Sequence, residues 1–186
     1  MQLPDFPPIS DETLEAISER HGLRAEEIFP SKDAGIFNAI YLIGGEYVLR
    51  VPRDAPPFVA AIRKESVAVP AARAAGVRTP ALVAFDDSLE LLPVPYAIYE
   101  RVRGETLGAL DVGPEDTPGV WHDVGRDLVR LHQGVGEHGP VANLECESLP
   151  DPRPMPGELA SAGYFTAEEA RWLSGWLDLL SPSRSP

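Results

Sequence analysis

The stretch that decides the fold reads Gly35-Ile-Phe-Asn38-Ala-Ile-Tyr-Leu-Ile43-Gly44-Gly45-Glu46-Tyr-Val-Leu-Arg50-Val51. Adjacent glycines between two alternating apolar runs are typical of a tight β-hairpin turn, which predicts strands over 39–43 and 46–51. Side chains alternate along a strand, so Arg50 points away from the face of Leu49 and Val51. The hairpin therefore carries one cation apart from its apolar face.

A helical segment follows a proline-rich connection, and it carries a carboxylate at Glu65. On a helix that advances about 100° per residue, Glu65 shares one side with apolar residues at 58, 62, 69 and 72. An unpaired carboxylate on the core side would cost several kcal/mol. Because Arg50 is the nearest candidate cation, we expect Arg50 and Glu65 to contact each other with partial burial.

Caps, turns and breakers divide the remaining sequence into further elements. Pro70 predicts a kink or break near Val69 in the Glu65 helix. The amphipathic helix expected from Pro118 to His132 should bury Val120, Val124, Leu128 and Leu131, and 134–163 is expected to be a long connection. The other expected elements are a helix from Ser10 to Gly22 with Ser10 as its N-cap, strands at 25–29, 81–85 and 96–102, and a helix over 166–180 that begins with a capping box of Thr166 and Glu169.

Six short motifs stand in order along the chain: Gly35-Ile-Phe-Asn38, Tyr47-Val-Leu-Arg-Val-Pro52, Arg63-Lys-Glu65, Ala75-Gly-Val-Arg-Thr-Pro80, Tyr99-Glu-Arg-Val-Arg-Gly-Glu-Thr-Leu107 and Leu128-Val-Arg-Leu-His132. This order resembles that of the aminoglycoside phosphotransferases over about residues 34–180. The resemblance implies the choline-kinase-like variant of the protein-kinase fold. It predicts an α+β architecture, with an antiparallel five-stranded sheet and one packed helix over 1–102 and a mainly helical C-terminal lobe over 103–186.

The same resemblance implies a nucleotide site. The loop of Gly35, Ile36, Phe37 and Asn38 would cover the phosphates of ATP, although an ordinary hairpin turn would give the same local sequence. Arg50 would hold the α- and β-phosphates, and Glu65 would orient Arg50.

The remaining contacts implied for the nucleotide are to its base and its metal. The backbone of Glu100 and Val102 would bind the adenine edge, although an edge strand that runs into a turn would give the same local structure. Mg²⁺ would accompany the nucleotide.

The catalytic loop of such kinases, His-Gly-Asp followed by Asn, has no counterpart in the sequence. The only asparagines are Asn38 and Asn143, and neither follows such a loop. Asp33 precedes Asn38 without a His ahead of it, so we interpret that match as chance. We therefore expect a truncated C-terminal lobe with no catalytic residues, no metal ligands and no phosphoryl transfer by this chain alone.

Three functions remain open at this point. The chain is part of an ATP-dependent phosphotransferase acting on a small-molecule hydroxyl, a non-catalytic nucleotide- or partner-binding half-kinase, or a truncated product without its own activity. The substrate is not defined by these residues. A catalytic segment encoded downstream would favour the first function, whereas a stop codon would favour the others.

Composition excludes some partners. With 29 acidic and 16 basic residues, the formal charge of −13 argues against binding to nucleic acid or to anionic membranes. An acidic surface would suit a cationic substrate such as an aminoglycoside. The single cysteine, Cys146, excludes an intramolecular disulfide, and it fits a cytoplasmic protein.

The helix expected over 166–180 has an apolar band too broad to face water, made by Trp172, Leu173, Trp176, Leu177 and Leu180. Such a face predicts a covering partner, which would be the catalytic half of the lobe or a second copy of the chain.

Overall fold

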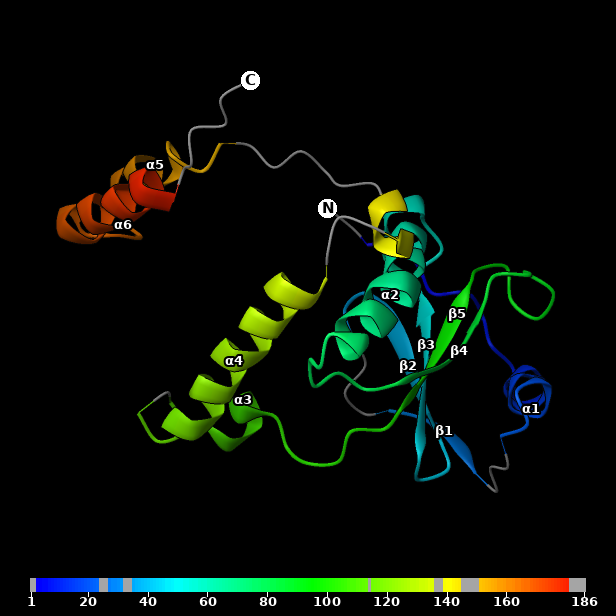
Figure 1. The fold of residues 1–186 in the computed structure, drawn as a ribbon. Coiled ribbons are helices and arrows are strands. Elements are labelled where there is room, and N and C mark those ends of the chain that lie inside the picture. Colours follow the sequence, from blue (N-terminus) through cyan, green and yellow to red (C-terminus); the bar gives the residue numbers. More distant parts are fainter. Residues whose placement is uncertain are drawn as a thin grey trace. The chain divides into compact units, whose positions relative to one another are not determined.

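The predicted hairpin lies at the centre of a five-stranded antiparallel sheet with the order β1-β2-β3-β5-β4. The strands are β1 (Ile28–Pro30), β2 (Asn38–Ile43), β3 (Tyr47–Pro52), β4 (Leu82–Asp86) and β5 (Tyr96–Glu100). The described residues also form six α-helices and one 3₁₀ helix (Gly139–Asn143), so the α+β class is confirmed (Figure 1). The helices are α1 (Asp11–Arg20), α2 (Pro56–Ala74), α3 (Leu107–Leu110), α4 (Pro118–Gly134), α5 (Met155–Ser161) and α6 (Ala167–Leu180).

The computed structural model describes residues 3–23, 27–31, 35–113, 115–135, 139–144 and 151–180. The chain divides into two compact units, Met1–Leu144 and Glu145–Pro186. The predicted lobe boundary after residue 102 stays a prediction. Cys146, Asp33 and the first two residues of the strand expected at 25–29 lie outside the described residues.

The sheet is covered on both faces, because β5 buries its side chains in alternation. Tyr96 and Ile98 join a core with Leu14 and Ile17 of α1, whereas Ala97 and Tyr99 join Ile62 of α2. Figure 1 shows α1 and α2 on opposite sides of the sheet. Arg50 pairs with Ala97 in the ladder, which places Arg50 on the α2 face as the alternation predicted.

The predicted helix caps are confirmed at α1 and α6. The hydroxyl of Ser10 accepts from the backbone N–H of Thr13 at 3.2 Å. Thr166 and Glu169 form a reciprocal capping box, with N–H donors 2.7 and 3.2 Å from their side-chain acceptors. These local hydrogen bonds fix where each helix begins.

Several predicted boundaries were wrong. The hairpin connection is Gly44–Glu46 rather than two glycines, with Gly44 at φ 57°, and β5 ends at Glu100 rather than Val102. α2 continues to Ala74 despite Pro70, since a helix can lose one hydrogen bond to proline where neighbouring turns hold. α5 lies within the stretch that was expected to be a connection, and α3 was not predicted.

The apolar face of α4 was also predicted wrongly as core. Val120, Val124 and Leu128 are each 44–50% exposed. The sequence pattern identified the apolar side of the helix, but the described residues do not cover it. In the other unit, Trp172 and Trp176 of α6 are also exposed, in an edge-to-face contact with ring centres 6.2 Å apart. The side chain of Leu180 lies outside the description.

Among the described residues, none of the helices has both the length and the apolar content needed to cross a bilayer.

Candidate functional site

The predicted contact between Arg50 and Glu65 is confirmed. Nη1 of Arg50 donates to Oε2 of Glu65 at 2.7 Å, and Nη2 donates to Oε1 at 3.3 Å. Their side chains are 30% and 33% exposed, so the pair is partly buried as expected. Arg50 lies on β3 and Glu65 lies on α2. The two hydrogen bonds between them fix the orientation of the guanidinium plane.

Tyr99 of β5 is the third member of this group, and sequence analysis missed its role. Its hydroxyl donates to Oε2 of Glu65 at 3.4 Å, and its ring centre lies 5.6 Å from the guanidinium carbon of Arg50. Burial, followed by the negative charge of Glu65, raises the pKa of Tyr99 to about 12. The hydroxyl of a buried tyrosine usually needs a hydrogen-bond partner, and this requirement could have indicated from the sequence that Tyr99 contacts a polar group.

A hollow of about 300 Å³ opens beside the ion pair. Its lining consists of Phe37, Asn38, Arg50, Pro57, Phe58, Ala61, Ile62 and Glu65. Phe37 of the loop stacks on Phe58 of α2, with ring centres 5.7 Å apart. The hollow thus combines four predicted site residues with an apolar wall that α2 supplies.

The other two predicted loop residues, Gly35 and Ile36, precede this hollow. A Cβ on Gly35 would lie 3.2 Å from the carbonyl oxygen of Asn38, so the turn leaves little room for a side chain. Ile36 is 66% exposed. The residue directly after β3 holds the loop, because Nε of Arg53 donates to the Ile36 carbonyl at 2.7 Å and the Arg53 backbone N–H donates to the Phe37 carbonyl at 3.2 Å.

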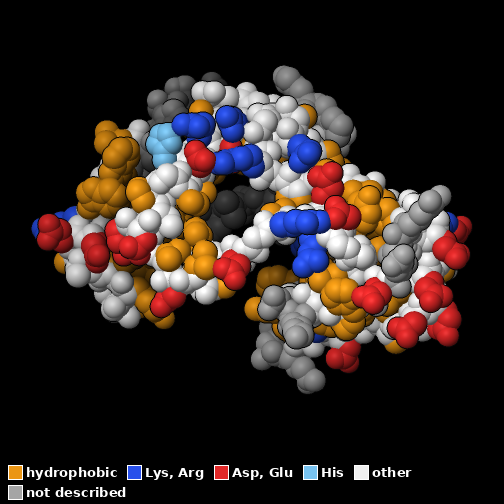
Figure 2. Space-filling view, turned by 90° about the horizontal axis from the view of Figure 1, so that it is seen from below, with side chains coloured by type: hydrophobic (Ala, Val, Ile, Leu, Met, Phe, Trp, Pro, Cys, Tyr) orange, Lys and Arg blue, Asp and Glu red, His pale blue; other side chains and the backbone are white. Residues whose placement is uncertain are grey.

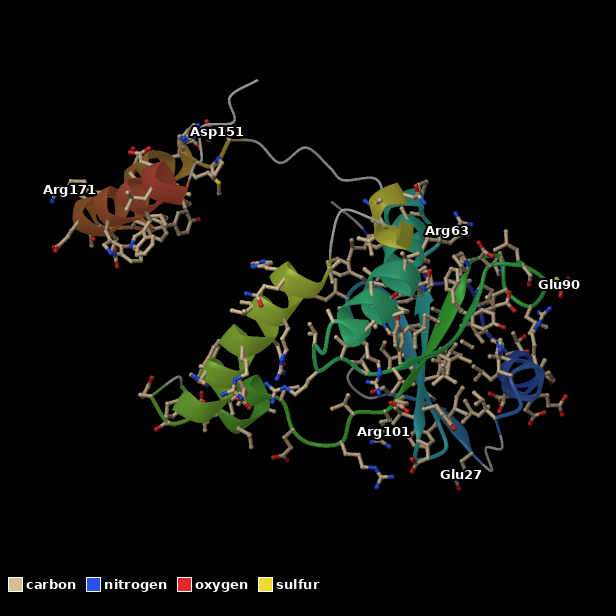
Figure 3. The ribbon with its side chains drawn as sticks, viewed as in Figure 1. Glu27, Arg63, Glu90, Arg101, Asp151 and Arg171 are labelled. Carbon is tan, nitrogen blue, oxygen red and sulfur yellow. The ribbon has the colours of Figure 1, made fainter. Side chains whose placement is uncertain are left out.

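Glu100 and Val102 lie away from the hollow, where the chain leaves the sheet. Figure 3 shows Arg101, between them, just beyond the end of β5. The backbone N–H of Glu100 donates to the Ala81 carbonyl at 2.9 Å, and the carboxylate of Glu100 lies 3.9 Å from Arg73. Because the N–H of Glu100 is already bonded to Ala81, its backbone carbonyl is the group that could accept a hydrogen bond from a ligand.

Comparison with known families decides the assignment. The model of the phosphotransferase enzyme family matches residues 33–185. The chain belongs to this family. The match includes the loop, the ion pair, Tyr99 and the exposed turn after β5.

Solved phosphotransferase structures share the kinase-like fold of this family. The gentamicin complex of APH(2")-IIa has a TM-score of 0.57 at 14% identity, covering 92% of this chain and 57% of that one. ADP-bound APH(2'')-Ib gives 0.55 at 15% identity, covering 91% of this chain and 57% of that one. The wild-type aminoglycoside 2'-phosphotransferase-IIIa, in complex with GDP, gives 0.52 at 16% identity, covering 90% and 57%.

The chain thus spans somewhat more than half of the length of these phosphotransferase structures. No curated protein sequence matches it at a significant level.

A phosphotransferase of this family also needs groups that hold the metal. In the described part of the chain, no cluster of three or more His, Cys, Asp or Glu side chains could bind a metal ion. What the arrangement offers is an oriented cation, a loop beside it and an exposed backbone segment at the end of the same sheet.

Proposed function

We propose that the chain is the nucleotide-binding part of a phosphotransferase that moves a phosphoryl group from ATP to a hydroxyl of a small molecule. The observation that carries this proposal is the two-pronged contact between Arg50 and Glu65. The pair uses only part of the donor fork of Arg50, so N–H groups remain for phosphate oxygens. Protein kinases place a strand lysine and a helix glutamate in the same relation.

The loop and the end of β5 would bind the two ends of the nucleotide. Gly35, Ile36, Phe37 and Asn38 would cover the phosphates. The Glu100 carbonyl would accept from the adenine amino group, and the Val102 N–H would donate to the ring.

The spacing along the sheet supports this placement of the nucleotide. Tyr47 pairs with Glu100, and Arg50 lies three residues further along β3. At the rise of a strand, that separation is about 10 Å, which suits an extended nucleotide.

The substrate we propose is a cationic small molecule that carries hydroxyl groups, such as an aminoglycoside. The formal charge of −13 supports this class, since an anionic surface attracts cations. Figure 2 shows acidic side chains on both sides of the face in view, with hydrophobic side chains exposed among them. Structures of similar fold are described as complexes with gentamicin and with kanamycin.

Catalysis itself would need a base within a His-Gly-Asp loop, a segment that this sequence does not contain, together with ligands for Mg²⁺. We propose that 1–102 forms the nucleotide lobe and 103–186 part of a helical lobe, in a cytoplasmic protein.

The exposed Trp172 and Trp176 support contact with a complementary half or a second copy. A non-catalytic nucleotide-binding module is the second candidate.

Nucleotide binding to the purified chain tests the proposal. ATP with Mg²⁺, and in parallel GTP, should raise the melting temperature in proportion to the logarithm of ligand concentration. Arg50→Ala should weaken the affinity by about tenfold or more, the loss of a charge-assisted hydrogen bond. Arg63→Ala is the matched control, because the side chain of Arg63 on α2 is half exposed and lies 3.8 Å from the exposed carboxylate of Asp87.

Turnover separates the candidate functions. We expect no aminoglycoside phosphorylation by the chain alone, and turnover when a polypeptide with the catalytic loop is added. Absence of any nucleotide-dependent stabilisation of the wild-type chain would refute the proposed function.

A further inference from the structure

The N-terminal segment and the 35–38 loop meet at one side chain, Arg53, directly after β3. Nε of Arg53 donates to the Ile36 carbonyl at 2.7 Å, and Nη1 donates to the carbonyl of Pro4. The guanidinium carbon lies 4.0 Å from the ring centre of Phe6. One planar cation thus joins two segments that lie 17 and 49 residues away in the sequence.

Backbone hydrogen bonds on either side of Arg53 strengthen the junction. The Arg53 N–H donates to the Phe37 carbonyl at 3.2 Å, and the Asp54 N–H donates to the Asp5 carbonyl at 3.2 Å. The loop and the N-terminal segment therefore attach to two adjacent residues that directly follow β3. Movement of the loop would have to break contacts on the side chain and on the backbone together.

The chemistry of this junction requires arginine. The guanidinium presents several donors in a rigid plane, so it can reach two carbonyls while its face rests on an aromatic ring. A lysine ammonium is a point charge and cannot keep this geometry. Among the residues that the structure describes, Arg53 has no ion pair. Its guanidinium donates instead to the backbone carbonyls of Ile36 and Pro4.

We propose that Arg53 is a positioning residue that fastens the 35–38 loop to the N-terminal segment 4–6, so that this segment supports the nucleotide site from behind. The inference rests on the proposed function for its effect on nucleotide binding. Its mechanical part concerns the ligand-free protein alone. Besides this side chain, the loop that is to cover phosphates has the stacking of Phe37 on Phe58, the backbone bond from Arg53 to Phe37 and the pairing of Asn38 with Pro52.

Hydrogen exchange of the full chain without ligand tests the mechanical part. Arg53→Lys keeps the charge but loses the fork, and Phe6→Ala removes the ring without touching the loop. Both variants should speed exchange in peptides that contain 35–38 and the Arg53 amide, by about tenfold for Arg53→Lys. Arg126→Lys is the control, since Arg126 is an exposed residue of α4 that pairs with Asp123 at 3.5 Å.

Affinities for ATP and for adenosine test the functional part. Both variants should weaken ATP binding and leave adenosine binding unchanged, because only ATP carries phosphates for the loop to cover. Circular dichroism and thermal melting check that each variant is folded.

Three results would overturn the inference. Unchanged loop exchange in Arg53→Lys would remove the fastening role. Equal losses for ATP and adenosine, or a loss of ATP affinity in Arg53→Lys but none in Phe6→Ala, would remove the positioning role. If the wild-type chain binds neither ligand, the proposed function fails, while the exchange experiment still decides the fastening role.

Discussion

Oε2 of Glu65 accepts from two residues at once, from Nη1 of Arg50 at 2.7 Å and from the hydroxyl of Tyr99 at 3.4 Å. A single carboxylate oxygen on α2 therefore connects the helix to β3 and to β5. The arrangement makes Glu65 the point through which α2 sets the direction of the Arg50 fork. Its contribution to stability can be measured separately from nucleotide binding.

We predict that Glu65→Gln lowers the free energy of unfolding by about 1–2 kcal/mol, because an amide keeps the shape but leaves a partly buried cation without its counter-charge. Urea unfolding followed by circular dichroism measures the change. Glu46→Gln is the control, since Glu46 and Arg103 form a surface pair with side chains 68% and 74% exposed. It should change stability by less than about 0.5 kcal/mol. Equal effects of the two variants would mean that the Glu65 pair behaves as an ordinary surface pair.

The raised pKa of Tyr99 predicts that the stability of the folded chain depends on pH in the alkaline range. Its folded pKa of about 12 lies above the ordinary value of 10, so the folded chain keeps a proton that the unfolded chain loses. The stability that Tyr99 contributes is therefore complete below about pH 10 and is lost as the pH rises toward 12. Tyr99→Phe should show a shallower decline in stability over that range. An unchanged decline would place its origin elsewhere in the protein.

The environment of His21 predicts that the stability of the folded chain also depends on pH in the acidic range. The Tyr96 hydroxyl donates to Oδ2 of Asp86 at 3.1 Å, so its oxygen accepts from Nε2 of His21 at 3.0 Å. Burial lowers the pKa of His21 below its ordinary value of 6.5. As the pH falls from 6.5, the unfolded chain takes up a proton that the folded chain resists, so folding loses stability.

His21→Gln keeps a donor toward Tyr96 and removes the titration. Its stability should therefore vary less than that of the wild type between pH 7 and about pH 5. Urea unfolding at a series of pH values measures the slope. His122→Gln, on exposed α4, is the control for the removal of a histidine as such. A wild-type slope in His21→Gln would contradict the prediction.

The sequence predicted the hairpin and the Arg50–Glu65 contact because both follow from short periods. The two-residue period of a strand placed Arg50 on the other face of the sheet from Leu49. The 3.6-residue period of a helix placed Glu65 on the same side as Ile62. Arg53 could not be placed in this way, since its partners Ile36 and Pro4 come from segments without periodicity. Such contacts depend on how the chain closes on itself.

The apolar face of α4 marks a second limit. Its helical pattern correctly identified the side that carries Val120, Val124 and Leu128, which is a property of the helix alone. Whether that side is covered depends on segments elsewhere, and the described residues leave it exposed. Periodicity therefore predicts which face of an element is apolar, but not what lies against it.

The end of α4 gives the last prediction, because it approaches the end of α2 more closely than a side chain allows. A Cβ on Gly134 would lie 2.5 Å from the Cβ of Ala75 and 3.1 Å from its Cα. Ion pairs hold α4 to the segment after α2 at points further from this end, with Arg78 2.8 Å from both Asp127 and Asp123. Substitution of Gly134 should therefore push the helix away from α2 against these contacts.

Gly134→Ala should lower the free energy of unfolding by about 1–3 kcal/mol, the cost of overpacking. Gly125→Ala is the matched control on the same helix, because a Cβ there meets nothing within 4 Å. The control should be more stable than the wild type by about 0.5–1 kcal/mol, since alanine favours the helix over glycine. Urea midpoints at equal m-values measure both changes. If Gly134→Ala were as stable as Gly125→Ala, α4 would not pack against Ala75 in solution, and the junction between α2 and α4 would have to be drawn differently.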